Sequence, residues 1–218
     1  MSASGALLWS YNASNAVNAT ASATPNMKQS TKPIPIRTAP AVGDVTGDSS
    51  PEIAVGLGDV FQAETHGGVV LLNASGKLVS GWPQVTLDVG GTGALNEIPD
   101  NLTDGVLSSP AIGDIDGDGT NEVVYGAFDQ RIYARRANGT LLPGWPQFVL
   151  DTVWSSPALA DLDGDGVAEV IVGVDTHTYN SPPRHTVQGG DLYAFKGDGS
   201  ILWRANQDEI FQSSPAVG

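Results

Sequence analysis

Short runs of β-branched and aromatic residues alternate with clusters of Gly, Pro, Asn and Asp along most of the chain. Runs such as Val69–Leu72, Val123–Tyr125 and Val170–Val172 contain few polar residues and are too short to be typical helices. The clusters between them carry turn signals, for example Asn138-Gly139, a strong hairpin dipeptide. The pattern predicts an all-β protein of short strands joined by turns.

The same order of runs recurs three times, so the chain contains an internal repeat. Each repeat has a Pro-Ala run, an acidic loop, a Val-rich run that ends in Gly, and two further runs. Four strands per repeat of about 47 to 70 residues predict β-propeller blades of four antiparallel strands. The predicted order is the end of a preceding blade plus a long loop (1–38), blade 1 (39–107), blade 2 (108–154), blade 3 (155–212) and the start of a next blade (213–218).

About three complete blades plus partial blades at both ends fall short of the roughly four to eight blades of a closed ring. We therefore expect either a piece of a longer protein or half of an assembly. In both cases the open ends would expose strand edges able to pair with further blades or with another copy.

An acidic stretch between the first two runs of blade 3 carries the clearest chemical signal. It extends from Asp161 to Glu169, with carboxylates at positions one, three, five and nine and glycines at positions four and six. Like charges about 4 Å apart repel by roughly 1 kcal/mol in water, so clustered carboxylates oppose folding unless a cation joins them. Calcium fits, because it takes about six to eight oxygen ligands in flexible geometry, including a backbone carbonyl.

The loop has a second full copy from Asp114 to Glu122 and a degraded copy from Asp44 to Glu52. An EF-hand is excluded, because its loop needs Glu at position twelve and helices on both sides. Here Tyr125 stands at position twelve of the second copy, and the flanking runs are predicted strands. Three equivalent loops on separate blades indicate a structural role rather than catalysis.

Composition excludes several classes of function. The 24 acidic and 10 basic residues give a formal charge of -14, so nucleic acids and anionic membranes would repel the chain. No cysteine is present, which excludes disulfides, thiolate catalysis and zinc-thiolate sites. No apolar stretch is long enough for a membrane span, and a secretion signal would have to lie outside these residues.

The insertions are the expected recognition surfaces, because loops on a rigid scaffold often carry binding sites. The most distinctive is 176–187, within an insertion from Asp175 to Gly190. His66, His177 and His185 all lie in insertions; their spacing fits no metal motif, and we expect them to be solvated. Trp154 lies outside the repeated tryptophan positions and is the expected exposed aromatic contact.

Four features together resemble the FG-GAP/VCBS repeats of integrin-α-like β-propellers. They are Ser-Ser-Pro-Ala, the Asp-x-Asp-Gly-Asp-Gly-x-x-Glu loop, the Val-rich strand ending in Gly, and Gly-Trp-Pro-Gln, and they cover most of 39–218. The resemblance implies that each loop joins the first two strands of a blade and holds calcium. PQQ-type repeats are a second resemblance, over 192–203 and 213–217, but they lack the acidic loop, so the first fits better.

Carried over position by position, the resemblance implies one set of calcium ligands in each blade. In blade 3 they are Asp161, Asp163, Asp165, the Val167 carbonyl and Glu169. In blade 2 they are Asp114, Asp116, Asp118, the Thr120 carbonyl and Glu122. In blade 1 they are Asp44, Thr46, Asp48, the Ser50 carbonyl and Glu52; because Thr46 removes a charge, we expect this site to be weaker or empty.

The expected function is a non-enzymatic, calcium-binding scaffold for interaction or adhesion, outside the cell or on its surface. Its partner would be a protein or glycan bound at the loop rim, with no nucleic acid and no membrane insertion. Three alternatives stay open: a lectin-type propeller that binds carbohydrate, a non-catalytic part of a larger secreted enzyme such as a polysaccharide lyase, and a self-assembling surface unit.

Overall fold

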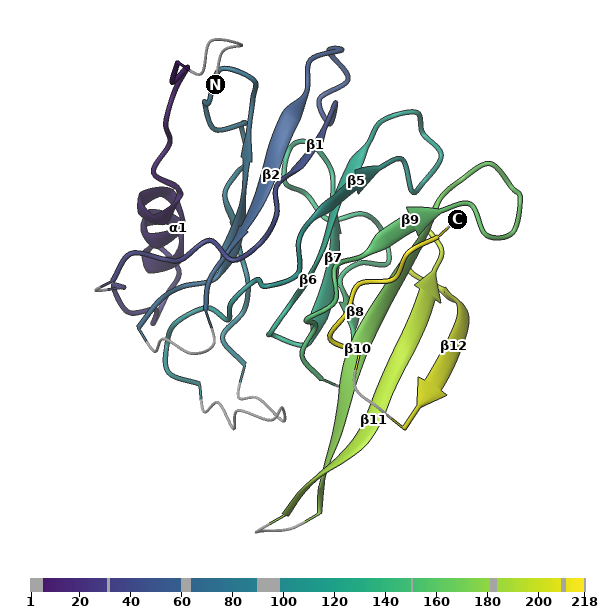
Figure 1. The fold of residues 1–218 in the computed structure, drawn as a ribbon. Helices are drawn as coiled ribbons and strands as arrows, with labels where there is room; N and C mark the ends of the chain where they lie inside the picture. The colour runs from purple at the N-terminus through teal and green to yellow at the C-terminus, as the bar shows by residue number, and fades with distance from the viewer. Residues whose placement is uncertain are drawn as a thin grey trace.

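The structure is a computed structural model that describes residues 6–30, 32–59, 64–89, 99–149, 151–180, 184–208 and 211–217, without the side chains of 176–180 and 184–188. Within these ranges, twelve strands form three four-stranded antiparallel sheets, which follow one another in chain order (Figure 1). No helix in these ranges has the length and apolar character needed to cross a membrane. The predicted all-β blades of four antiparallel strands are confirmed.

The strands of each sheet are hydrogen-bonded in sequence order, as in propeller blades. Blade 1 contains β1 (Ala41–Gly43), β2 (Glu52–Leu57), β3 (Gly68–Leu72) and β4 (Gln84–Val85). Blade 2 contains β5 (Ala111–Gly113), β6 (Glu122–Ala127), β7 (Arg131–Arg135) and β8 (Gln147–Phe148). Blade 3 contains β9 (Ala158–Ala160), β10 (Glu169–Asn180), β11 (Arg184–Phe195) and β12 (Ile201–Gln207). The three described sheets do not close into a ring.

Two hydrophobic cores lie between successive blades, which explains why the middle strands do not alternate polar and apolar residues. One core joins Val69 and Leu71 of blade 1 to Val123 and Tyr125 of blade 2. The opposite face of β6, with Val124, belongs to a second core shared with blade 3. All six residues of β6 are buried as a result. A sheet covered on both faces needs a continuous apolar run.

Helix α1 (Ala13–Ser22) covers the outer face of blade 1, where we expected a long loop (Figure 1). Its buried residues Ala13, Val17 and Ala21 are four apart, so they lie on one side of the helix. Asn12 caps the helix by accepting a hydrogen bond from the Asn15 N–H. The signal is weak in the sequence, because small alanines supply most of the apolar face.

The Ser-Ser-Pro-Ala motif ties blade 2 to blade 1 and blade 3 to blade 2. The first serine forms a hydrogen bond within its own blade: Ser108 Oγ accepts the Gly126 N–H at 3.1 Å. The second works between blades: Ser109 Oγ accepts the Ala39 N–H, and Ser156 Oγ accepts the Ser109 N–H. The ladder continues to the last described segment through Ser214 Oγ and the Ser156 N–H at 3.0 Å.

The Gly-Trp-Pro-Gln motif forms the second link between blades. Trp82 Nε1 donates to the Ala137 carbonyl of blade 2, and Trp145 Nε1 donates to the Gly197 carbonyl of blade 3, both at 2.8 Å. Both indoles are buried. The glycine before Trp145 has a positive φ, and a Cβ on it would lie 1.9 Å from the Asp198 carbonyl oxygen. Only glycine fits such a close approach.

Three expectations need correction, two of them about the insertions. His66 is fully buried rather than solvated: its ring nitrogens contact the Lys28 carbonyl and the Thr103 N–H, and burial lowers its pKa. The Asp175–Gly190 insertion is a ribbon in which β10 and β11 stay paired to Asn180 and Arg184 (Figure 1). Trp154 is half-buried against the edge of the Phe128 ring. The side chains of His177 and His185 lie outside the described residues.

Replacing Trp145 by Phe tests the link between blades 2 and 3. The change removes the Nε1–H donor and leaves the Gly197 carbonyl without this partner, so we expect a loss of about 1–3 kcal/mol of unfolding free energy. Urea unfolding measures it. Trp203→Phe is the matched control, because Trp203 is 38% exposed on β12 and should change stability by less than about 0.5 kcal/mol. Equal losses in both variants would contradict the role assigned to Trp145.

Candidate metal centres

The three acidic loops occupy equivalent places, each joining the first two strands of its blade at the same end of the sheets (Figure 1). The first aspartate curls the loop by accepting two backbone hydrogen bonds. Asp114 Oδ1 accepts the Gly117 N–H at 2.7 Å, and Oδ2 accepts the Gly119 N–H at 2.9 Å. The same pair of bonds forms at Asp44 and at Asp161. The sequence spacing therefore determines the loop conformation, through backbone donors.

The ninth-position glutamate begins the second strand and points back under its loop. Glu52, Glu122 and Glu169 are all buried, and each accepts a backbone hydrogen bond through Oε2 from position two of its loop. In blade 1, Glu52 accepts a further bond from the Thr46 N–H at 3.0 Å. Backbone hydrogen bonds thus hold these carboxylates against the loops.

Glu122 differs because its second oxygen is buried without a protein partner. Oε1 is shielded from solvent and accepts no hydrogen bond. The pKa of Glu122 is raised to about 7, chiefly by burial and also by the negative charges of Asp116, Asp118 and Asp114, although the hydrogen bond from the Ile115 N–H opposes the shift. A buried carboxylate oxygen without a donor is costly, so its position calls for a cation or a proton.

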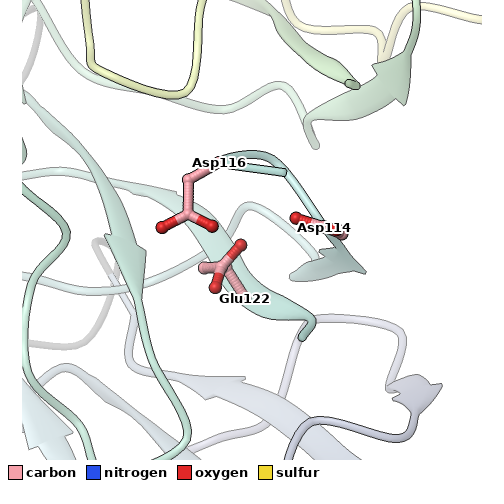
Figure 2. Close-up of side chains that lie close together, drawn as sticks. All are labelled: Asp114, Asp116 and Glu122. Carbon is pink, nitrogen blue, oxygen red and sulfur yellow. The ribbon is translucent and has the colours of Figure 1, made fainter. Parts of the chain in front are cut away.

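Two trios of carboxylates are brought together. In blade 2, oxygens of Asp114, Asp116 and Glu122 lie within 4.8 Å of one another, and Figure 2 shows Asp116 and Glu122 facing each other. In blade 3, Asp161, Asp163 and Glu169 form the equivalent trio. Blade 1 offers only Asp44 and Glu52 at these positions, because Thr46 replaces the third acid. Within the described residues, close acidic trios therefore occur in blades 2 and 3 alone.

The fifth-position aspartates lie outside these trios. Asp118 Oδ1 accepts the Thr120 N–H at 2.8 Å, and Asp165 Oδ1 accepts the Val167 N–H at 2.9 Å. Asp48 makes the same bond to the Ser50 N–H. These side chains close the turn that follows the glycines. Their role as metal ligands, and that of the carbonyls of Ser50, Thr120 and Val167, stays a prediction.

Each trio also has a basic neighbour that we did not identify from the sequence. Arg136 lies 2.8 Å from Asp116, and Lys196 lies 2.5 Å from Asp163 and 3.9 Å from Asp165. The ion pair lowers the pKa of Asp163 and raises that of Lys196. Both bases follow the third strand of their blades. The repeat alignment identifies this shared position but not the acid that each base contacts. Both bases also line a pocket of about 320 Å³ shared by blades 2 and 3.

Comparison with known proteins supports the repeat assignment. The FG-GAP-like repeat family matches residues 114–172, and the FG-GAP repeat family matches residues 153–193. Both matches include the Asp161 loop, and the first begins at Asp114. The resemblance to FG-GAP repeats is thus confirmed, over residues 114–193.

One solved structure with some similarity is the V. cholerae biofilm matrix protein Bap1. It is 24% identical over 78% of this chain, with a TM-score of 0.35. The chain spans 28% of the length of that protein. No curated protein matches the chain.

Glu122→Gln tests the electrostatic state of the blade 2 trio in metal-free protein. Because its folded-state pKa of about 7 lies above the ordinary 4.5, the contribution of Glu122 to wild-type stability is greatest below pH 4.5 and is lost as the pH rises through about 7. The variant has no carboxyl group to ionise at this position, so it does not lose stability in this way. We expect it to be more stable than the wild type at pH 8, by up to about 3 kcal/mol, and nearly equal at pH 4. Urea unfolding in EDTA at both pH values measures the difference, and a variant destabilised equally at both would contradict it.

Proposed function

We propose that the chain is a calcium-stabilised β-propeller scaffold for adhesion-type interactions outside the cell. The buried Oε1 of Glu122, without a hydrogen-bond partner beside Asp114 and Asp116, carries the calcium part of the proposal. All the side-chain atoms in the trio that could bind a metal are carboxylate oxygens, which suit a hard cation. The trio in blade 3 offers the same set, so two sites are proposed, in blades 2 and 3.

The positions of the ligands explain how a cation would stabilise a blade. Asp114 directly follows β5, Asp116 lies within the loop, and Glu122 begins β6. A cation bound to all three would therefore fix the end of the first strand against the start of the second. It would also remove the repulsion among the carboxylates, which opposes the fold when no cation is bound.

The repeat assignment supports a scaffold rather than an enzyme. Two equivalent loops on neighbouring blades, with no difference in role between them, fit a repeated structural device. For the adhesion part of the proposal, we expect exposed elements of the propeller to contact the binding partner. The β10–β11 ribbon is the proposed contact element, because it projects beyond its sheet at the end opposite the acidic loops (Figure 1).

A thermal melt of metal-stripped protein tests calcium binding. At 1 mM calcium, a site with Kd of about 0.1 mM adds about 1.4 kcal/mol, or roughly 3–6 °C in Tm for a chain of this size. We expect no such rise with 1 mM magnesium, which requires stricter octahedral geometry. An unchanged Tm in calcium would contradict the proposal.

Matched variants assign the ligands within the same experiment. Asp116→Asn should remove about half of the calcium-dependent rise, because it disables one of two trios. Thr46→Ala, at the same loop position in blade 1, should leave the rise intact. Asp118→Asn distinguishes two possible roles of Asp118, as a metal ligand and as a residue that closes the turn. A lower Tm in EDTA with an unchanged calcium-dependent rise would assign Asp118 to the turn alone.

Protease treatment of intact source cells tests the extracellular location. We expect added protease to degrade the protein, or the protein to be recovered from the medium. A cytoplasmic marker, protected until the cells are lysed, is the control. Protection of this protein together with that marker would contradict an extracellular role.

A further inference from the structure

We infer that Arg136 and Lys196 are built-in counter-ions of the acidic loops, which compete with a divalent cation for Asp116 and Asp163. The inference rests on the proposed calcium sites and adds a control on their affinity. Each base belongs to the same blade as the aspartate it contacts. Each would lower the affinity of its loop for the cation and reduce repulsion in the loop when the cation is absent.

The three blades provide an internal comparison for this position. Asn73, Arg136 and Lys196 each follow the third strand and begin the same turn, with a backbone N–H that donates across it at 2.8 to 2.9 Å. The backbone is therefore equivalent in the three blades, and only the side chain differs. A base stands in the two blades whose loops carry the third acid, whereas the neutral Asn73 accompanies Thr46.

Asn73 shows what the position does without a charged partner. Its side-chain oxygen accepts hydrogen bonds from the backbone N–H groups of Ser75 and Lys77, both at 3.0 Å. It thus folds onto its own hairpin and stabilises the turn. The turn itself does not need a base. The bases in blades 2 and 3 are therefore better explained by the acidic loops that they contact.

The contacts place each base on one oxygen of an aspartate that belongs to a trio. Arg136 binds Asp116 Oδ2, and Lys196 binds Asp163 Oδ2. The other oxygen of each aspartate accepts a backbone N–H from the fifth position at 3.3 Å. Neither carboxylate therefore has an oxygen free of a donor. A cation that binds either trio has to displace the base or bind close to its positive charge.

The surroundings allow the bases to move away. Both side chains are partly exposed, at 36% for Arg136 and 38% for Lys196, so their ion pairs are partly screened by solvent. Both also line the pocket of about 320 Å³ shared by blades 2 and 3. A displaced base can therefore enter solvent or this pocket without disturbing the core.

Lys196→Asn and Arg136→Asn test the inference, because Asn is the residue that blade 1 uses in the same turn. Melting in EDTA and isothermal titration with calcium chloride are the two measurements. We expect each variant to melt a few degrees lower in EDTA and to bind calcium on the order of tenfold more tightly at the altered blade. Unchanged or weaker calcium binding would overturn the inference.

Two further variants separate charge from packing. Asn73→Lys places a base opposite Thr46 and should leave the calcium affinity of blades 2 and 3 unchanged. Lys196→Arg keeps the charge and should bind calcium as the wild type does; tenfold tighter binding by this variant would show that side-chain shape is responsible and would overturn the inference. Failure of the proposed function is distinguishable, since the unmodified protein would then show no calcium binding in the titration.

Discussion

Each of the three described sheets depends on a neighbouring sheet to bury at least one of its faces. The middle strands are apolar on both sides, so a single blade would expose one or both faces to water. Successive blades share cores, and the serine ladder and the tryptophan links fix one sheet against the next. On the outer face of blade 1, helix α1 packs where a further sheet would pack in a ring. This nearest-neighbour packing is the general basis of repeat proteins.

The acidic loops lie at one end of the sheets, where each joins the first two strands of its blade. Their first aspartates and ninth glutamates accept backbone hydrogen bonds, so the loops have a defined shape before any cation is considered. The cost of that shape is a group of carboxylates held close together, one of them deeply buried. Cations, protons and the neighbouring bases are three ways to offset this cost. The balance among them would determine how strongly each blade responds to calcium.

Most of the fold was predictable because the repeat displays it three times. Strand runs, turn glycines and loop positions recur in the same order, so they predicted the four-stranded blades and three acidic loops; that only positions one, three and nine come together, in blades 2 and 3, was not predicted. Other features were not predictable in this way. Helix α1 uses small alanines for its buried face, and burial of His66 depends on Lys28 and Thr103, which are distant in sequence. The turn-closing bonds of Asp118 and Asp165 depend on loop geometry.

The sequence by itself determined the repeat, the all-β character and the acidic positions, because these follow from local patterns of polarity, turn residues and spacing. Only the tertiary structure decided which charges meet. It left Glu122 Oε1 without a hydrogen-bond partner and placed Arg136 and Lys196 on the third-position aspartates. Burial and pairing of charges depend on segments that are distant in sequence, so local patterns cannot specify them.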